Sequence, residues 1–130
     1  MIVDTSAVIA ILNGEPERET FVRAIVESST ARMSAANFLE TAIVVDGLGD
    51  PVKSRRFNEL VDALGIEVVD ATAEQAHIAR AAYRDFGKGS GHPARLNFGD
   101  CFSYALAVAT GESLLFKGDD FVHTDIRPAL

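Results

Sequence analysis

The sequence of 130 residues is 48% hydrophobic and 24% charged, which is typical of a single globular domain with a packed core. Its apolar runs are too short to cross a bilayer, its start lacks the basic stretch of a signal peptide, and its single cysteine excludes an internal disulfide. We therefore expect a cytoplasmic protein with no membrane partner. The net charge of −7 excludes nucleic-acid binding through general positive charge, unless the acids gather at a metal site and the bases form a local patch.

Short apolar strands alternate with amphipathic helices along the chain, and glycine, proline and capping residues mark their ends. Pro16 suits the first turn of a helix, for example, and Gly65 ends another. In chain order we predict a strand at 2–3, helices at 7–12 and 16–27, a strand at 32–34, helices at 36–48 and 52–64, a strand at 66–69, a helix at 73–86, a loop at 87–93, a helix at 98–110 and a strand at 113–116. This order predicts one α/β domain over residues 1–130, with a parallel sheet flanked by helices.

Acidic side chains follow the first and the last predicted strands. Asp4 comes directly after the first strand, and Asp119 and Asp120 come shortly after the last. Asp100 lies in the first turn of the helix that leads into the last strand, and Glu40 lies in an otherwise apolar helix. Ligands of an open parallel sheet bind outside the carboxyl ends of its strands. We therefore expect these acids at one edge of the sheet if the first and last strands are neighbours.

Gathering several carboxylates costs free energy through repulsion and desolvation unless a divalent cation neutralises them. Oxygen ligands suit Mg²⁺, with Mn²⁺ as a plausible substitute, whereas the three histidines and one cysteine show no zinc spacing. A carboxylate site that binds Mg²⁺ is typical of phosphoryl chemistry. The aspartates also have structural interpretations: Asp4 and Asp100 are placed to cap helices, and the Asp119–Asp120 pair suits a plain turn. Glu40 is harder to explain in this way, because the helix face around it is apolar. The functional interpretation depends on the presence of all these acids together, and not on any one of them.

The same residues carry a resemblance to a known family. The relevant segments are Asp4-Thr5-Ser6-Ala7, Leu39-Glu40-Thr41-Ala42, Asn97-x-x-Asp100 at the start of a small-residue helix, and Gly118-Asp119-Asp120-Phe121. These segments occur in the same order and at the same separations as in the PIN-domain ribonucleases, so nearly the whole chain resembles that family. The likeness is closest to the toxins of VapBC toxin–antitoxin pairs. The resemblance implies a three-layer α/β/α sandwich with a central, mainly parallel sheet of about five strands. It also implies a metal-dependent endoribonuclease, that is, a hydrolase acting on RNA.

Carried over to this chain, the family's acidic quartet gives the site. The catalytic residues would be Asp4, Glu40, Asp100 and Asp120. The metal would be held by Asp4, Asp100 and Asp120, with Asp119 as the alternative to Asp120 or as a ligand acting through water. Gly118 stands where family members often have Asn or Asp, so the chain departs from the family pattern there.

Three polar residues beside these acids are candidates to support them. Thr5 and Ser6 would orient Asp4 or contact phosphate, although both also suit a helix cap. Asn97 would hydrogen-bond within the site or cap the helix that Phe98 begins. We interpret Cys101 as a buried small hydrophobe, because it points to a different side of the helix from its neighbouring acid.

Basic residues concentrate between positions 80 and 95, where they could contact RNA phosphates. The candidates are Arg80, Arg84, Lys88 and Arg95, and the alternative is a solvated helix face with a mobile loop. Single-stranded or loop RNA is the expected substrate, because its backbone can bend into a metal site. The resemblance further implies a VapB-type antitoxin that inserts a basic residue into the acidic pocket. The apolar helices fit a homodimer in addition.

Two rival classes use similar residues. A receiver-like, Mg²⁺-binding phospho-acceptor domain needs an acid such as Asp70 after a central strand and a lysine such as Lys117 after the last. It also needs an acidic pair after the first strand, where Asp4 stands alone, and it leaves the other acids unexplained. A haloacid-dehalogenase-type phosphatase needs a second aspartate where this chain has Ser6.

Overall fold

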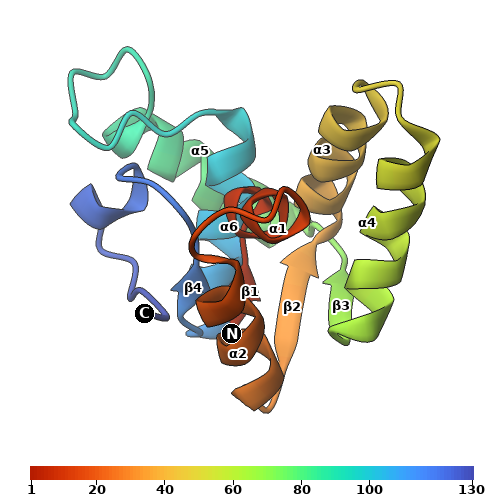
Figure 1. The fold of residues 1–130 in the computed structure, drawn as a ribbon. Coiled ribbons are helices and arrows are strands. Elements are labelled where there is room, and N and C mark those ends of the chain that lie inside the picture. The colour runs from red at the N-terminus through yellow and green to blue at the C-terminus, as the bar shows by residue number, and fades with distance from the viewer.

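The computed structural model describes all residues, 1–130, as an α/β fold built on a four-stranded parallel sheet. The strands are β1 (Ile2–Val3), β2 (Ala31–Ser34), β3 (Ile66–Val69) and β4 (Leu114–Leu115), and their order in the sheet is β3-β2-β1-β4. Between β1 and the edge strand β4, Ile2 lies opposite Leu114 and Val3 opposite Leu115. The segments that follow β1 and β4 therefore leave the sheet side by side at the same edge (Figure 1).

Six α-helices connect and flank the strands. They are α1 (Thr5–Leu12), α2 (Arg18–Glu27), α3 (Ala35–Asp46), α4 (Pro51–Ala63), α5 (Ala73–Phe86) and α6 (Phe98–Thr110). Helix α6 begins and ends at the predicted residues, because Asn97 forms a capping box at its start and Gly111 adopts a left-handed φ of 69° at its end. Helix α2 begins two residues later than predicted, at Arg18, because Pro16 lies in the preceding turn. No helix of the chain combines the length and the apolar character that crossing a membrane requires.

Helices cover both faces of the sheet, which confirms the predicted three-layer α/β/α sandwich (Figure 1). On one face, Val3, Met33 and Leu115 pack with residues of α1, α2, α3 and α4. On the other face, Ile2 and Leu114 pack with residues of α5 and α6. Successive strand residues point to opposite faces, so even the two-residue strands contribute to both buried clusters.

The sheet has four strands, whereas about five were expected. The edge beside β4 is where residues 127–129 run: the N–H of Leu114 donates to the carbonyl oxygen of Arg127 (3.0 Å), and the N–H of Ala129 donates to the carbonyl oxygen of Leu114 (2.9 Å). These bonds form one bridge, between Leu114 and Pro128. Because β4 offers only two residues for pairing, this segment adds a bridge and not a fifth strand. Proline suits such an outer position, since its nitrogen has no hydrogen to donate.

Candidate functional site

The carboxylate of Asp4 is buried at the point where β1 ends and α1 begins. Asp4 is 2% exposed and is the N-cap of α1. Its Oδ2 accepts hydrogen bonds from the backbone N–H of Ser6 (2.9 Å) and from Ser6 Oγ (2.6 Å), and its Oδ1 accepts one from Ser103 Oγ (2.5 Å). Three donors therefore compensate for removing this carboxylate from water and determine its orientation. A capping role and a role in the site are compatible for Asp4.

Glu40 reaches the same region from α3. Its Oε1 accepts a hydrogen bond from Thr5 Oγ1 at 2.5 Å and a longer one from Asn37 Nδ2 at 3.4 Å. The carboxylate lies against the first turn of α6, because a Cβ added at Gly99 would stand 1.7 Å from Glu40 Oε2. Only glycine at position 99 allows the carboxylate to approach α6 this closely.

Asp100 lies in the first turn of α6 and completes the capping box. Its Oδ2 accepts a hydrogen bond from the N–H of Asn97 (2.9 Å), and its own N–H donates to Asn97 Oδ1 (2.8 Å). Burial raises the pKa of Asp100 from 3.8 to about 7 against the lowering effect of the Asn97 hydrogen bond, and the charges of Asp4, Asp120 and Glu40 raise it further. Acids that are far apart in the sequence therefore act on one carboxyl group.

Asp119 and Asp120 lie on the exposed turn that follows β4. Gly118 precedes them with a φ of 104°, in the region that favours glycine, and turns the chain away from the strand. Asp120 precedes a short 3₁₀ helix, η1 (Phe121–His123), but its side chain forms no capping hydrogen bond. Of the two acids, Asp120 is the one that contributes to the raised pKa of Asp100. This difference favours Asp120 over Asp119 as the member of the site.

The donor chemistry of these acids suits Mg²⁺ or Mn²⁺, because every available ligand is a carboxylate oxygen. The repulsion that raises the pKa of Asp100 is also of the kind that a divalent cation relieves. As the side chains stand, no group of three or more acids, histidines or cysteines could hold a metal ion. Hydrogen bonds within the chain already engage both carboxylate oxygens of Asp4, through Ser6 and Ser103, and Oδ2 of Asp100, through Asn97. The metal site stays a prediction.

The three polar residues considered as supports have different partners. Ser6 binds Asp4, and its Oγ also accepts a hydrogen bond from the N–H of Lys117 at 3.0 Å, which ties α1 to the end of β4. Thr5 faces α3 and hydrogen-bonds Glu40 instead of Asp4. Asn97 caps α6 through the backbone.

Two buried polar residues that contact the acids are missed by the sequence analysis. Ser103 is 0% exposed, lies three residues after Asp100 on α6, and donates to Asp4. Asn37 is also 0% exposed and lies three residues before Glu40 on α3. Each is one helical turn from a candidate acid and therefore shares its side of the helix. That spacing is the signal that could have identified them.

The predicted basic cluster is exposed, but its charges are not all free. Arg84 Nε donates to Asp85 Oδ1 at 2.8 Å, so much of its charge is compensated. Arg80, Lys88 and Arg95 take part in none of the ion pairs of the molecule. Arg95 has a φ of 52°, an uncommon left-handed conformation for a residue with a side chain. Three uncompensated cations therefore remain on α5 and on the loop that leads into α6.

The strand order speaks against a receiver-like phospho-acceptor domain. Asp70 follows β3, an edge strand that β2 separates from β1, whereas Asp4 follows β1. The ammonium group of Lys117 forms ion pairs with Glu15 and Glu17. The acid and the lysine that such a domain must bring together lie beyond opposite edge strands.

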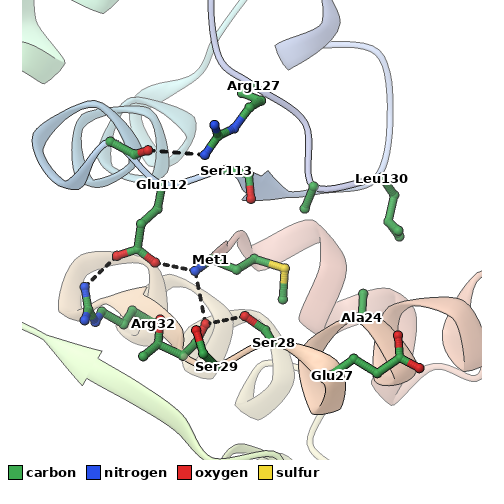
Figure 2. A pocket seen from close by; sticks show the side chains of 13 residues that line it. Met1, Ala24, Glu27, Ser28, Ser29, Arg32, Glu112, Ser113, Arg127 and Leu130 are labelled. Atoms are coloured by element: carbon green, nitrogen blue, oxygen red, sulfur yellow. Dashed lines mark hydrogen bonds and ion pairs between the residues drawn. The ribbon is translucent and has the colours of Figure 1, made fainter.

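An open hollow of about 590 Å³ lies at the other, amino edge of the sheet (Figure 2). Within it, Glu112 accepts hydrogen bonds from Arg32 Nη1 (2.5 Å) and from the ammonium group of Met1. These residues lie on β2 and just before β4 and β1, so the ion pairs connect three strands. None of the candidate acids lines this hollow. Its charges largely satisfy one another, which indicates a structural role.

Comparison with known proteins identifies the family of this fold. The PIN domain family matches residues 1–127, so the chain belongs to the PIN-domain family. It is 54% identical over 129 residues to Ribonuclease VapC42 of Mycobacterium tuberculosis, and the alignment covers 99% of this chain and 98% of that protein. It is 53% identical over 130 residues to Ribonuclease VapC28 of the same organism, covering 100% of this chain and 98% of that protein. Within the PIN-domain family the chain is thus one of the VapC ribonucleases.

Solved structures agree with this fold at much lower sequence identity. The crystal structure of VapC20 of Mycobacterium tuberculosis, described as a toxin that cleaves the sarcin–ricin loop, superposes with a TM-score of 0.71 at 19% identity and covers 98% of both chains. A toxin–antitoxin complex from Klebsiella pneumoniae gives a TM-score of 0.70 at 15% identity, covering 92% of this chain and 88% of that one. These likenesses concern the fold alone.

Proposed function

We propose that the protein is the toxin of a type II toxin–antitoxin system and hydrolyses RNA phosphodiester bonds as a metal-dependent endoribonuclease. Membership of the VapC ribonucleases supports the reaction class. The observation that carries the site assignment is the close approach of Glu40 to the first turn of α6, which holds Asp100; the raised pKa of Asp100, to which burial and the charges of Asp4, Asp120 and Glu40 contribute, supports it. The catalytic residues in this proposal are Asp4, Glu40, Asp100 and Asp120.

In this proposal, Asp4, Asp100 and Asp120 would hold Mg²⁺ or Mn²⁺, with Asp119 as a neighbouring donor. A cation bound there supplies a Lewis acid that polarises the phosphodiester and favours the ionisation of water. The hydrogen bonds from Ser6 and Ser103 orient the Asp4 carboxylate before any cation binds. Asp100 Oδ2 accepts the hydrogen bond from Asn97, so Asp100 would bind the cation through Oδ1, and the cation would relieve the carboxylate repulsion.

Glu40 is the acid of the quartet that this proposal leaves free of the cation, and it would serve as the proton acceptor. Thr5 and Asn37 donate to its Oε1, whereas no protein group donates to its Oε2. In the proposed reaction, Oε2 takes a proton from the attacking water and the water oxygen forms a bond to phosphorus. The bond between phosphorus and the 3′ oxygen breaks in the same step, and the departing 3′ oxygen takes a proton from solvent water.

RNA reaches the site across the basic residues near the start of α6. Arg80, Lys88 and Arg95 are exposed and have no acidic partner, so they can bind phosphates. Arg84 contributes less, because Asp85 already binds its guanidinium group. An RNA segment without secondary structure fits best, since its backbone can turn between these cations and the acids. The RNA substrate and the single cysteine favour action in the cytoplasm.

A VapB-type antitoxin is the proposed regulatory partner. The acid site carries repulsion that no basic side chain of the chain itself relieves. An Arg or Lys side chain of the antitoxin would relieve that repulsion and occupy the place of the cation. We therefore expect the antitoxin and the divalent cation to compete for the same acids.

A second copy of the chain is the other proposed partner. Leu39, Ile43 and Phe98 are 59%, 63% and 78% exposed, and they line a groove between α3 and α6. An apolar face complements a second copy of itself, as a two-fold interface requires. We expect light scattering to report a homodimer, and Phe98→Asp to shift it to the monomer.

RNA cleavage by the purified chain tests the proposed function. We expect cleavage with Mg²⁺ or Mn²⁺, none after chelation by EDTA, and none by Asp4→Asn or Asp100→Asn. Asp70→Asn is the matched control, because this exposed acid lies beyond the opposite edge strand and should leave cleavage unchanged. Activity that survives complete chelation, or that is undiminished in both site variants, would exclude the proposed mechanism.

A further inference from the structure

Asn37 is fully buried on α3 and binds two different parts of the acid site. Its Nδ2 donates to the carbonyl oxygen of Gly99 at 2.9 Å and to Glu40 Oε1 at 3.4 Å. Both partners are acceptors, which assigns the amide orientation, because a flipped amide would place its oxygen against them. One carboxamide therefore connects the Glu40 carboxylate with the turn of α6 that carries Asp100.

The two helices come closest at the same place. A Cβ at Gly99 would stand 1.7 Å from Glu40 Oε2, so the carboxylate lies directly against the first turn of α6. Asn37 spans this approach from within the core. Its backbone is held as well, because Thr41 Oγ1 donates to its carbonyl oxygen at 2.8 Å. The position of Glu40 against α6 thus depends on a contact that Asn37 maintains.

The other half of this amide has no partner. Asn37 Oδ1 is buried and accepts no hydrogen bond. An unpaired buried acceptor costs about 1–3 kcal/mol, a cost that an apolar side chain of similar size avoids. Stability of the fold is therefore a weak reason for asparagine at this position. A need for its two N–H donors at the acid site is a stronger one.

We propose that Asn37 is a positioning residue: by holding Glu40 and the Gly99 turn together, it sets the separation between the carboxylates of Glu40 and Asp100. This inference rests on the proposed function and deepens it. Without the amide, Glu40 retains Thr5 as its hydrogen-bond partner, and the first turn of α6 loses its tie to α3. Asp100 then binds the cation less tightly, because part of the binding free energy must restore the position of its turn, and Glu40 stands less well placed relative to Asp100.

Asn37→Leu tests this role, and Gln75→Leu is its matched control. Gln75 is likewise buried, its Oε1 likewise accepts no hydrogen bond, and it lies on α5 without a hydrogen bond to the acids. We expect Asn37→Leu to weaken Mn²⁺ binding, measured by titration calorimetry, about tenfold. It should also lower kcat for RNA cleavage about 100-fold while leaving KM nearly unchanged. Gln75→Leu should change neither quantity.

Equal Mn²⁺ affinity and equal kcat in the two variants would overturn the inference. A wild-type chain that neither binds Mn²⁺ nor cleaves RNA would instead overturn the proposed function, and the inference with it. If Asn37→Leu does not fold, the wild-type chain decides by NMR. The side-chain NH₂ signals of Asn37 should shift when Mg²⁺ is added, and those of Gln75 should not. If the backbone N–H signal of Asp100 shifts while the Asn37 signals stay unchanged, Asn37 does not have the proposed positioning role.

Discussion

Replacing Asp100 by asparagine should make the metal-free protein more stable at pH 8. Burial and three neighbouring acids place the pKa of Asp100 at about 7 in the folded chain, compared with its ordinary value of 3.8. Between about pH 4 and pH 7 the folded state therefore retains a proton that the unfolded chain releases. The free energy of unfolding therefore falls as the pH rises through that window, and the loss of stability is complete above about pH 7.

The magnitude follows from the same pKa. At about 1.4 kcal/mol for each pKa unit, the difference between 3.8 and about 7 corresponds to about 4 kcal/mol. Asp100 is partly exposed, so solvent screening reduces this to about 2 kcal/mol. Asparagine can still accept the hydrogen bond from Asn97, but losing a charge from the first turn of α6 costs about 0.5 kcal/mol. The net gain expected for Asp100→Asn is about 1.5 kcal/mol at pH 8.

Urea unfolding in EDTA at pH 5 and pH 8 measures this difference. The free energy of unfolding of the wild-type chain should fall over that interval by more than that of Asp100→Asn. Added Mg²⁺ should stabilise the wild-type chain more than the variant. Asp119→Asn is the control, because Asp119 is an exposed neighbour that does not contribute to the raised pKa of Asp100. A variant with the wild-type stability at pH 8 and the same pH dependence would refute the reasoning.

Three further substitutions test other contacts. Gly99→Ala should lower the free energy of unfolding by about 1–3 kcal/mol in urea and reduce RNA cleavage, because its Cβ collides with Glu40; a fully active variant would contradict the described approach. Ser103→Ala removes the donor to Asp4 Oδ1 and should weaken Mn²⁺ binding about tenfold by calorimetry, with a nearly unchanged circular dichroism spectrum. Glu112→Gln breaks the ion pairs at the amino edge of the sheet and should lower the free energy of unfolding by about 1 kcal/mol; a changed kcat would argue against a purely structural role there.

The parts of the fold that are predictable from the sequence are those that local chemistry determines. The ends of α6 follow from the capping pair Asn97 and Asp100 and from Gly111, so its bounds match the structure. The edge beside β4 does not follow from local patterns. Whether residues near Pro128 add a strand or a single bridge depends on how much of β4 is free to pair, which is set by contacts between distant segments.

The site was predictable to a similar degree. The rule that parallel strands end at one edge is enough to associate Asp4 with Asp120, because each follows a strand. Which side of a helix faces the site is harder to infer from the sequence. The three-residue spacings that link Asn37 and Ser103 to acids show a shared side of a helix, but the side that faces the site depends on packing.

The double use of Asp4, as the cap of α1 and as a candidate reacting group, restricts how this protein can lose its activity. A random change at this position also loosens the helix that follows, since a capping side chain replaced by alanine costs about 1 kcal/mol. Most mutations at Asp4 would therefore lower the stability of the fold as well as the activity, and few would leave a stable, inactive protein. For laboratory expression of the chain, we expect Asp4→Asn to remove the proposed activity while preserving the start of α1, because asparagine also caps helices.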